Sequence, residues 1–268
     1  MKSFRLYLAG FCLSVFCLTS CMKGSNEWEG IVFGVLDFSV KGGAFVLKTS
    51  SGDLYSPSLK SFMDEGSMKL YDCYIILCRL NSDLPENAPN VVAANGFQTI
   101  SILQYEAIPK YGLSTSMLST STPLPNEVPV SKVIESSDFV DRYLFMVHVV
   151  SIPEDWELSW SLSYDFTSMM PTKDENGKRY YDLYVRATIK NESTKTQKVD
   201  MLFVNVYDIG SYFSTAATLE KISQESNYNE NTSSFTVRFF YASSIDEETN
   251  TITWKNEQRD LKIADFLL

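Results

Sequence analysis

Apolar and polar residues alternate one by one along much of the second half of the chain. In residues 156–166 the apolar side chains occupy the even positions, and in residues 180–190 they occupy the odd positions from Tyr181 onward. A period of two predicts strands with one packed and one solvated face, as in an antiparallel sheet. Residues 199–207 follow across a polar stretch and predict a hairpin with 180–190. Further strands are expected at 142–150, 234–241, 251–254 and 262–266, and one helix at 212–224.

The first half of the chain contains shorter runs of β-branched and aromatic residues. Residues 31–38, 44–49 and 54–55 are separated by turns rich in Gly, Ser and Asp. The run 69–80 is apolar almost throughout, which predicts a strand buried on both faces, and 91–105 adds one or two strands. About five short strands in so few residues favour closure into a small barrel, because closure leaves no unpaired edge. The five-stranded OB-fold is such a barrel.

Serine, threonine and proline gather between the two halves, in residues 109–129. This composition buries little surface and extends readily, so it predicts a linker. The predicted fold class is all-β, with an N-terminal five-stranded OB-type barrel followed by a C-terminal antiparallel β-sandwich. The predicted segments are a signal peptide at 1–20, a tether at 21–29, the barrel at 30–108, the linker at 109–129 and the sandwich at 130–268.

The beginning of the chain has the order of a bacterial lipoprotein signal. Lys2 and Arg5 precede the apolar run 6–18, whose thirteen residues are fewer than the roughly 20 that a spanning helix needs. Residues 18–21, Leu-Thr-Ser-Cys, resemble a lipobox. The resemblance implies that the Cys21 thiol receives a diacylglycerol, that the chain is cut before Cys21, and that the new amino group is acylated. The alternatives are a secretory leader with an accidental Cys21 and an uncleaved N-terminal anchor.

The residues after Cys21 bear on the membrane that would hold the lipid. Met22 rather than Asp follows the cysteine, which by analogy with lipoprotein sorting favours the outer over the inner membrane. No acidic run follows Cys21, so the surface-export tag of some lipoproteins is not evident. The periplasmic and the surface face both stay open.

Acidic residues outnumber basic ones, 33 to 23, for a formal net charge of −10. Removal of residues 1–20, which carry two basic and no acidic residues, would bring the charge to −12. Such a surface repels nucleic acid and anionic headgroups, so we expect membrane contact through lipid and no nucleic-acid partner. Residues 22–110 carry seven basic against ten acidic residues, which also argues against oligonucleotide binding on the barrel.

The residues that could carry chemistry are few. Cys73 and Cys78 are five positions apart in one predicted strand and face opposite sides, so they are expected to be buried free thiols. The single histidine, His148, lies in an apolar run and is predicted to be a core residue rather than a catalytic base. No Cys/His metal spacing occurs. We therefore expect no enzymatic activity, no catalytic residue, no metal and no cofactor.

Three residues of the strand 180–190 form a candidate ligand surface. The alternation places Tyr180, Tyr184 and Arg186 on the face opposite the core. Exposed tyrosines beside charged groups are typical of surfaces that contact sugars or partner proteins. The same residues would also suit packing under a loop or against another domain.

The order of these features resembles the NigD-like lipoproteins. The resemblance rests on the lipobox at 18–21, on Phe45-Val-Leu-Lys-Thr-Ser-Ser-Gly-Asp-Leu-Tyr-Ser-Pro57, and on the predicted hairpin 181–207. The Gly52-Asp53 turn inverts the Asp-Gly order of that family. The family is named for a bacteriocin-associated operon and has no established enzymatic activity. The resemblance implies an OB-type domain and a β-sandwich, and no catalytic residues.

The sequence thus favours a non-enzymatic cell-envelope lipoprotein that acts as a binding or scaffolding module. It would be held by a lipid on Cys21, in the outer membrane by the Met22 argument, and would meet another envelope protein or a glycan. The alternative is a carbohydrate-binding component of a glycan-uptake system. A fold alone does not decide between them.

Overall fold

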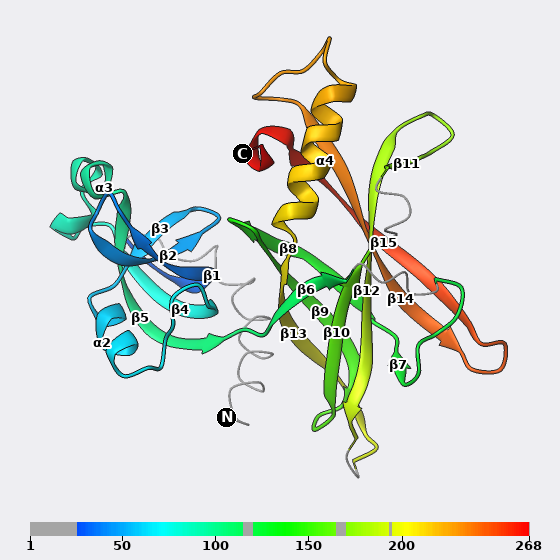
Figure 1. Ribbon diagram of the computed structural model, residues 1–268. Coiled ribbons are helices and arrows are strands. Elements are labelled where there is room, and N and C mark those ends of the chain that lie inside the picture. The colour runs from blue at the N-terminus through cyan, green and yellow to red at the C-terminus, as the bar shows by residue number, and fades with distance from the viewer. Residues whose placement is uncertain (1–25, 115–119, 165–169, 193–194, 268) are drawn as a thin grey trace. The chain divides into compact units, whose positions relative to one another are not determined.

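The computed structural model describes residues 26–114, 120–164, 170–192 and 195–267. This part of the chain divides into two units (Figure 1). The first unit runs to Lys110 and includes residues 138–141, and the second comprises 111–137 and the chain from Arg142 onward. Strands dominate both units, so the predicted all-β class is confirmed.

The first unit is a closed five-stranded barrel with the strand order β1-β2-β3-β5-β4. Strands β3 and β5 run parallel, and the other neighbouring pairs run antiparallel. This is the OB-type barrel that the short strands predict. Its elements are β1 (Glu27–Ser39), β2 (Ala44–Thr49), β3 (Gly52–Tyr55), α2 (Ser58–Asp64), β4 (Cys73–Asn81), η1 (Pro85–Asn87), α3 (Pro89–Asn95) and β5 (Phe97–Ala107).

The barrel core contains side chains from all five strands and from α2. Strand β4 is buried from Cys73 to Ile76 and again at Cys78, as its unbroken apolar run predicts. Both cysteines are buried free thiols, which confirms that prediction, and burial raises the pKa of Cys78 to about 12. The central cluster consists of Leu36, Leu47, Leu54, Leu59, Met68, Tyr74, Ile76, Cys78 and Ile100.

The second unit is built on one ten-stranded sheet. Eight strands follow the path β15-β14-β12-β10-β6-β13-β9-β8, and β7 and β11 pair with β12 beside that path. The elements are β6 (Lys110–Ser114), β7 (Glu127–Val128), β8 (Lys132–Val140), β9 (Tyr143–Pro153), β10 (Glu157–Ser163), β11 (Thr172–Lys173), β12 (Arg179–Asn191), β13 (Lys198–Asp208), α4 (Gly210–Ser223), β14 (Ser234–Asp246), β15 (Thr251–Lys262) and η3 (Ile263–Phe266).

This sheet folds over and packs its two halves face to face. The His148 ring on β9 stacks on the Trp160 ring on β10 with centroids 4.5 Å apart, and Trp160 also contacts Phe203 on β13. Strands β9 and β10 are three steps apart along the path, where neighbouring strands are spaced by about 4.8 Å. Direct ring contact therefore requires two facing layers. The second unit is sandwich-like, as predicted.

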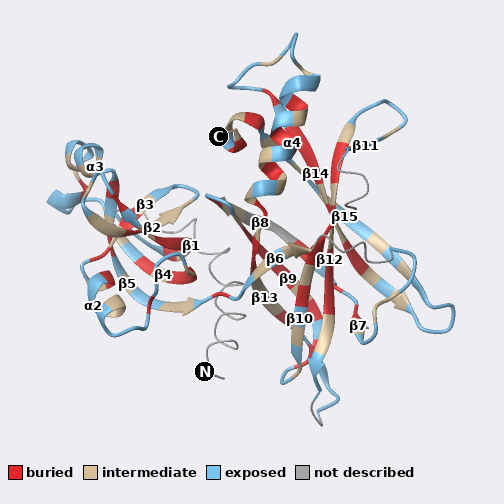
Figure 2. Ribbon diagram, viewed as in Figure 1, coloured by how far each residue is buried: buried red, intermediate tan, exposed pale blue. Residues whose placement is uncertain are grey.

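Helix α4 covers part of the sheet and matches the helix predicted at 212–224. Phe213 on its inner side is fully buried, and its ring contacts the rings of Phe235 and Phe266 at 5.8 and 5.3 Å. Figure 2 shows buried and exposed stretches alternating along α4, as expected of a helix with one face on a sheet.

The predicted hairpin of 180–190 with 199–207 is wrong. Strand β12 pairs with β10 and β14, whereas β13 pairs with β9, so the connection crosses between layers. Alternation identifies the packed face of each strand but not its neighbour. Two pairs, β12 with β14 and β6 with β10, are also parallel rather than antiparallel. Parallel partners need long crossover connections, and here those connections contain whole further strands.

Two further differences concern segment ends. Residues 251–262 form the single strand β15, and the last predicted strand is instead the 3-10 helix η3. Ile263 and Phe266 are three apart, a spacing that places both on one side of a 3-10 helix and buries both. In the predicted linker 109–129, residues 110–114 and 127–128 form β6 and β7 of the ten-stranded sheet. Their backbone groups pair with the sheet whatever their composition.

Candidate functional site

The structure places the three ligand-surface candidates on β12, opposite the core-facing Tyr181. Tyr180 is only 8% exposed and Arg186 only 1%, while Tyr184 is partly buried. The prediction of an exposed ligand surface is therefore wrong for Tyr180 and Arg186. Cys21, the predicted lipidation site, lies outside the described residues.

A distant segment of the chain covers Arg186. Its Nε lies 3.0 Å from Oε1 of Glu127, and both side chains are at most 1% exposed. Arg186 also donates from Nη2 to the carbonyl oxygen of Thr122, and Glu127 accepts from the Leu124 N–H at 2.7 Å. Burial raises the pKa of Glu127 and lowers that of Arg186, while their mutual attraction opposes both shifts. The pair fastens the segment that contains β7 onto β12.

The two tyrosines are packed by neighbouring strands. Tyr184 stacks on Phe240 with centroids 5.1 Å apart and meets the edge of Trp254 at 5.3 Å. The Arg238 guanidinium lies over the Tyr180 ring, 4.4 Å from its centroid. Packing under the protein's own segments, the alternative interpretation of this face, describes these contacts best.

His148 is a core residue, as predicted. It is fully buried, its ring stacks on Trp160, and its Nε2 lies 3.4 Å from the hydroxyl of Tyr207. Its Nδ1 has no hydrogen-bond partner among the described residues. Burial lowers the pKa of His148 to about 3, so the imidazole is neutral and has no route to a substrate.

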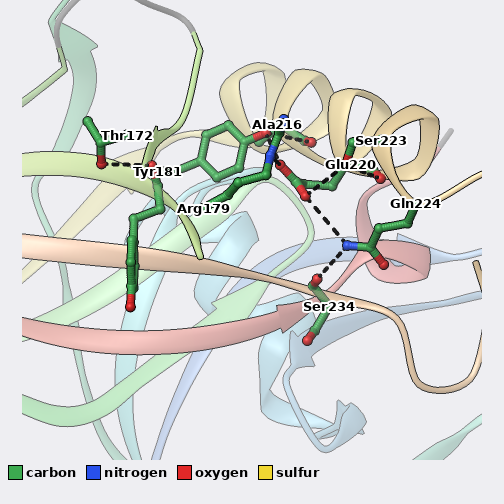
Figure 3. Close-up of polar contacts among 9 residues, drawn as sticks. Thr172, Arg179, Tyr181, Ala216, Glu220, Ser223, Gln224 and Ser234 are labelled. Atoms are coloured by element: carbon green, nitrogen blue, oxygen red, sulfur yellow. Dashed lines mark hydrogen bonds and ion pairs between the residues drawn. The ribbon is translucent and has the colours of Figure 1, made fainter. Parts of the chain in front are cut away.

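A buried carboxylate joins α4 to β12 (Figure 3). Glu220, with 4% of its side chain exposed, accepts from Arg179 Nε at 2.7 Å and from the Tyr181 hydroxyl at 2.9 Å. Ser223 donates to the other carboxylate oxygen at 3.2 Å. All these partners belong to the protein itself. The cluster therefore positions the helix and offers no free group for chemistry.

A cavity of about 390 Å³ lies beside the first turns of α4. We call it the α4 pocket. Its volume falls in the range of about 300–1,000 Å³ that is usual for small-molecule sites. It draws residues from five places in the second unit: β6, the turn before β9, the end of β10, the end of β13 and α4. The lining residues are Gly112, Leu113, Arg142, Tyr164, Asp208, Ser211, Tyr212 and Thr215.

The pocket combines an aromatic wall with a fixed ion pair. The rings of Tyr164 and Tyr212 lie 4.6 Å apart at 49°. Arg142 forms a two-pronged bond to Asp208, from Nε at 2.8 Å and from Nη2 at 2.7 Å. Asp208 raises the pKa of Arg142, and burial raises that of the Tyr212 hydroxyl. Both groups therefore keep their ordinary charge state at neutral pH.

A glycine lets the ion pair sit against α4. A Cβ built on Gly210, the first residue of the helix, would lie 2.6 Å from Cβ and 3.1 Å from Cα of Arg142. The Ile209 N–H donates to the Arg142 carbonyl oxygen at 3.0 Å, which holds the two backbones together. The position of Arg142 in the pocket thus requires a residue without a Cβ at position 210.

Sequence reasoning singled out none of the pocket residues as functional. Tyr164 was expected on the packed face of its strand, and it is 8% exposed. The other lining residues carry no motif, because they come from segments that only the tertiary fold brings together. Within the described ranges, no group of three or more His, Cys, Asp or Glu could hold a metal ion. Nor does any helix described in the structure have the length and apolarity to cross a membrane.

Comparison with known proteins identifies the barrel. Residues 24–106 match the family model described as "Lipoprotein OB domain". This match confirms the resemblance to lipoproteins with an OB-type domain that the barrel residues carry. No curated protein has a sequence that matches this chain significantly.

Solved structures resemble most of the chain. An uncharacterized protein from Parabacteroides merdae is 20% identical, with a TM-score of 0.70 over 87% of this chain and 99% of that one. A "putative toxin related protein" from Parabacteroides distasonis is 11% identical, with a TM-score of 0.51 over 89% and 96%. A NigD-like immunity protein from Bacteroides caccae is 10% identical over 85% and 91%, but its TM-score of 0.42 supports no inference. At these identities the first two show a shared fold alone.

Proposed function

We propose that this chain, whose N-terminal barrel belongs to the lipoprotein OB domain family, is a non-enzymatic binding protein of the cell envelope. The family implies association with the envelope. Attachment through a lipid on Cys21, in the outer membrane, is part of the proposal. The binding site is the α4 pocket, and its ligand is a saccharide with one ring against Tyr212.

The observation that carries the proposal is the pairing of an aromatic wall with a fixed polar pair in the α4 pocket. A sugar ring has apolar C–H faces and hydroxyls around its edge. Tyr212 is partly buried and lines the pocket, so its ring can cover such a face. The Arg142–Asp208 pair offers donors and acceptors to hydroxyls in a fixed geometry, because the fork to the carboxylate holds both side chains.

The test is glycan binding by the full-length protein in detergent. An array of bacterial and plant oligosaccharides would identify a ligand, and calorimetry would then measure its Kd. Arg142→Lys keeps the charge but removes the planar fork. We expect it to weaken binding about tenfold, which corresponds to about 1.4 kcal/mol. Because 56% of the Arg142 side chain is exposed, thermal stability should change little.

The barrel supplies a matched control. Arg79 also donates from Nε and Nη2 to one carboxylate, that of Glu29, and 49% of its side chain is exposed. Arg79→Lys should leave glycan binding unchanged. Equal losses in the two variants would contradict a site at the α4 pocket. An array without any bound glycan would favour the scaffolding role, with another envelope protein as partner.

The lipid has its own test. Mass spectrometry of protein purified from membranes should find more than one acyl chain on an N-terminal Cys21, because a single chain gives only marginal, reversible membrane binding. Cys21→Ala should retain residues 1–20 and carry no lipid. A wild-type protein that begins elsewhere or lacks acyl chains would contradict the lipobox.

A further inference from the structure

Trp28 presents an unusually placed aromatic surface at the beginning of β1. It is 43% exposed, although it belongs to a barrel strand. A Cβ on Gly30 would lie only 2.3 Å from Cζ2 of Trp28, so the indole occupies the space above the glycine. One side of the ring therefore rests on the strand, and the remaining surface is open to the surroundings.

Further apolar side chains lie at the same end of the barrel. Leu80 on β4 is the direct cross-strand partner of Trp28 and is partly buried. Leu84 follows in the chain and is 39% exposed. The Ser82 N–H donates to the carbonyl oxygen of Asn26 at 2.8 Å, which ties this segment to the beginning of β1. We call Trp28, Leu80 and Leu84 the Trp28 surface.

The chain keeps this surface within reach of the predicted lipid. Trp28 is seven residues after Cys21. A fully extended chain spans at most about 3.6 Å per residue, so Trp28 lies within about 25 Å of the acylated cysteine. The headgroup layers add roughly 5–8 Å on each side of the hydrocarbon core. Tryptophan is enriched at that level, because its ring is apolar and its N–H is polar.

We propose that the Trp28 surface contacts the headgroup layer of the membrane that holds the Cys21 lipid. The inference rests on the proposed lipid attachment and is independent of the α4 pocket. Acidic residues flank the surface: Glu27 and Glu29 neighbour Trp28 in β1, and Asp83 precedes Leu84. The contact is therefore apolar in origin and suits neutral rather than anionic headgroups.

The experiment uses the full-length acylated protein in phosphatidylcholine vesicles. The chain has four tryptophans, so the emission of Trp28 must be separated from that of the other three. Subtracting the spectrum of Trp28→Phe from that of wild type gives the emission of Trp28. On vesicles, this difference spectrum should lie at shorter wavelength than the same difference spectrum of non-acylated protein that begins at residue 22, measured in buffer without detergent. It should also lose intensity when the lipid carries bromine near the headgroup end of its acyl chains. Trp254→Phe is the matched control, and its difference spectrum should show neither change.

Flotation of the vesicles separates the two proposals. Protein that floats while its Trp28 emission is neither shifted nor quenched would overturn the membrane contact and leave the lipid attachment intact. Protein that does not float would overturn both. Replacing a third of the lipid with an anionic one should reduce the quenching, and stronger quenching there would contradict an apolar contact.

Discussion

Acidification should destabilise the second unit through His148. The folded protein holds this imidazole at 0% exposure between Trp160 and Tyr207, and burial lowers its pKa from 6.5 to about 3. The unfolded chain exposes the same imidazole to water, where it takes up a proton near pH 6.5. Below that pH the unfolded state binds more protons than the folded state. The stabilisation that is present above pH 6.5 is therefore lost as the pH falls toward 3.

The size of the effect follows from the two pKa values of His148. One pKa unit corresponds to about 1.36 kcal/mol. Between about pH 7.5 and about pH 4.5, the unfolded chain gains nearly one proton at His148 and the folded protein gains almost none. The free energy of unfolding should fall by about 2.5 kcal/mol from this residue, nearly all of it below pH 6.5.

Urea unfolding of wild type and His148→Phe over that pH range measures the effect. Both proteins would carry Trp28→Phe, so that the remaining tryptophans, all in the second unit, report its unfolding. The carboxylates are common to both proteins, so their titration cancels in the difference. Wild type should lose about 2.5 kcal/mol more than His148→Phe on acidification. Parallel pH profiles would show that His148 titrates normally in the folded protein and would refute the reasoning.

Three further predictions concern packing and reactivity. Gly210→Ala should lower the free energy of unfolding by about 1–3 kcal/mol, because the new Cβ would lie 2.6 Å from Cβ of Arg142. Urea unfolding measures the change, and an unchanged midpoint would contradict the prediction. Glu220→Ala should lower the free energy of unfolding by about 2 kcal/mol, because Arg179 loses the carboxylate that lies 2.7 Å away. Glu220→Gln keeps an acceptor and should lower it less. Cys78 should resist iodoacetamide at about pH 8 in the folded protein and react in urea, because burial raises its thiol pKa to about 12. Peptide mass spectrometry reads the outcome, and prompt labelling of folded protein would show an open barrel.

Side-chain periodicity predicts which face of a strand packs in the core, but not which segments cover its other face. It correctly places Trp160 and Leu183 in the core, because burial on one face is encoded every second residue. The burial of His148 is predicted instead by the apolar run around it. Periodicity fails for the other face of β12. Arg186 is polar and lies opposite the core, yet it is buried because Glu127, fifty-nine residues earlier, is laid over it. Nothing local to either residue indicates that contact.

The α4 pocket was beyond sequence reasoning for a related reason. Its ion pair joins Arg142 and Asp208, which are 66 positions apart, at the ends of two strands that the sequence did not predict to pair with each other. The antiparallel register of β9 with β13, which places Tyr143 opposite Asp208, brings them together. Gly210 gives a further signal only once α4 is known to begin there. Glycine is enriched just after the end of a helix rather than at its first position, so Gly210 by itself does not mark the beginning of α4.

The buried Arg186–Glu127 pair is better explained by the register it enforces than by net stability. Removing two charges from water loses several kcal/mol of hydration per ion, and their attraction at 3.0 Å only offsets that loss. Apolar residues of similar volume would pack β7 on β12 equally well. A shift of β7 by one position would then separate no charges, so nothing would penalise the wrong register. The double variant Arg186→Met, Glu127→Leu should therefore unfold at the same or a higher urea concentration than wild type. Its Val128 amide should exchange hydrogen faster, because the register of β7 on β12 is less firmly held. Glu127→Ala alone should cost about 3–5 kcal/mol, because it leaves Arg186 buried without its carboxylate. An equally large loss in the double variant would show that the charges are needed for stability itself.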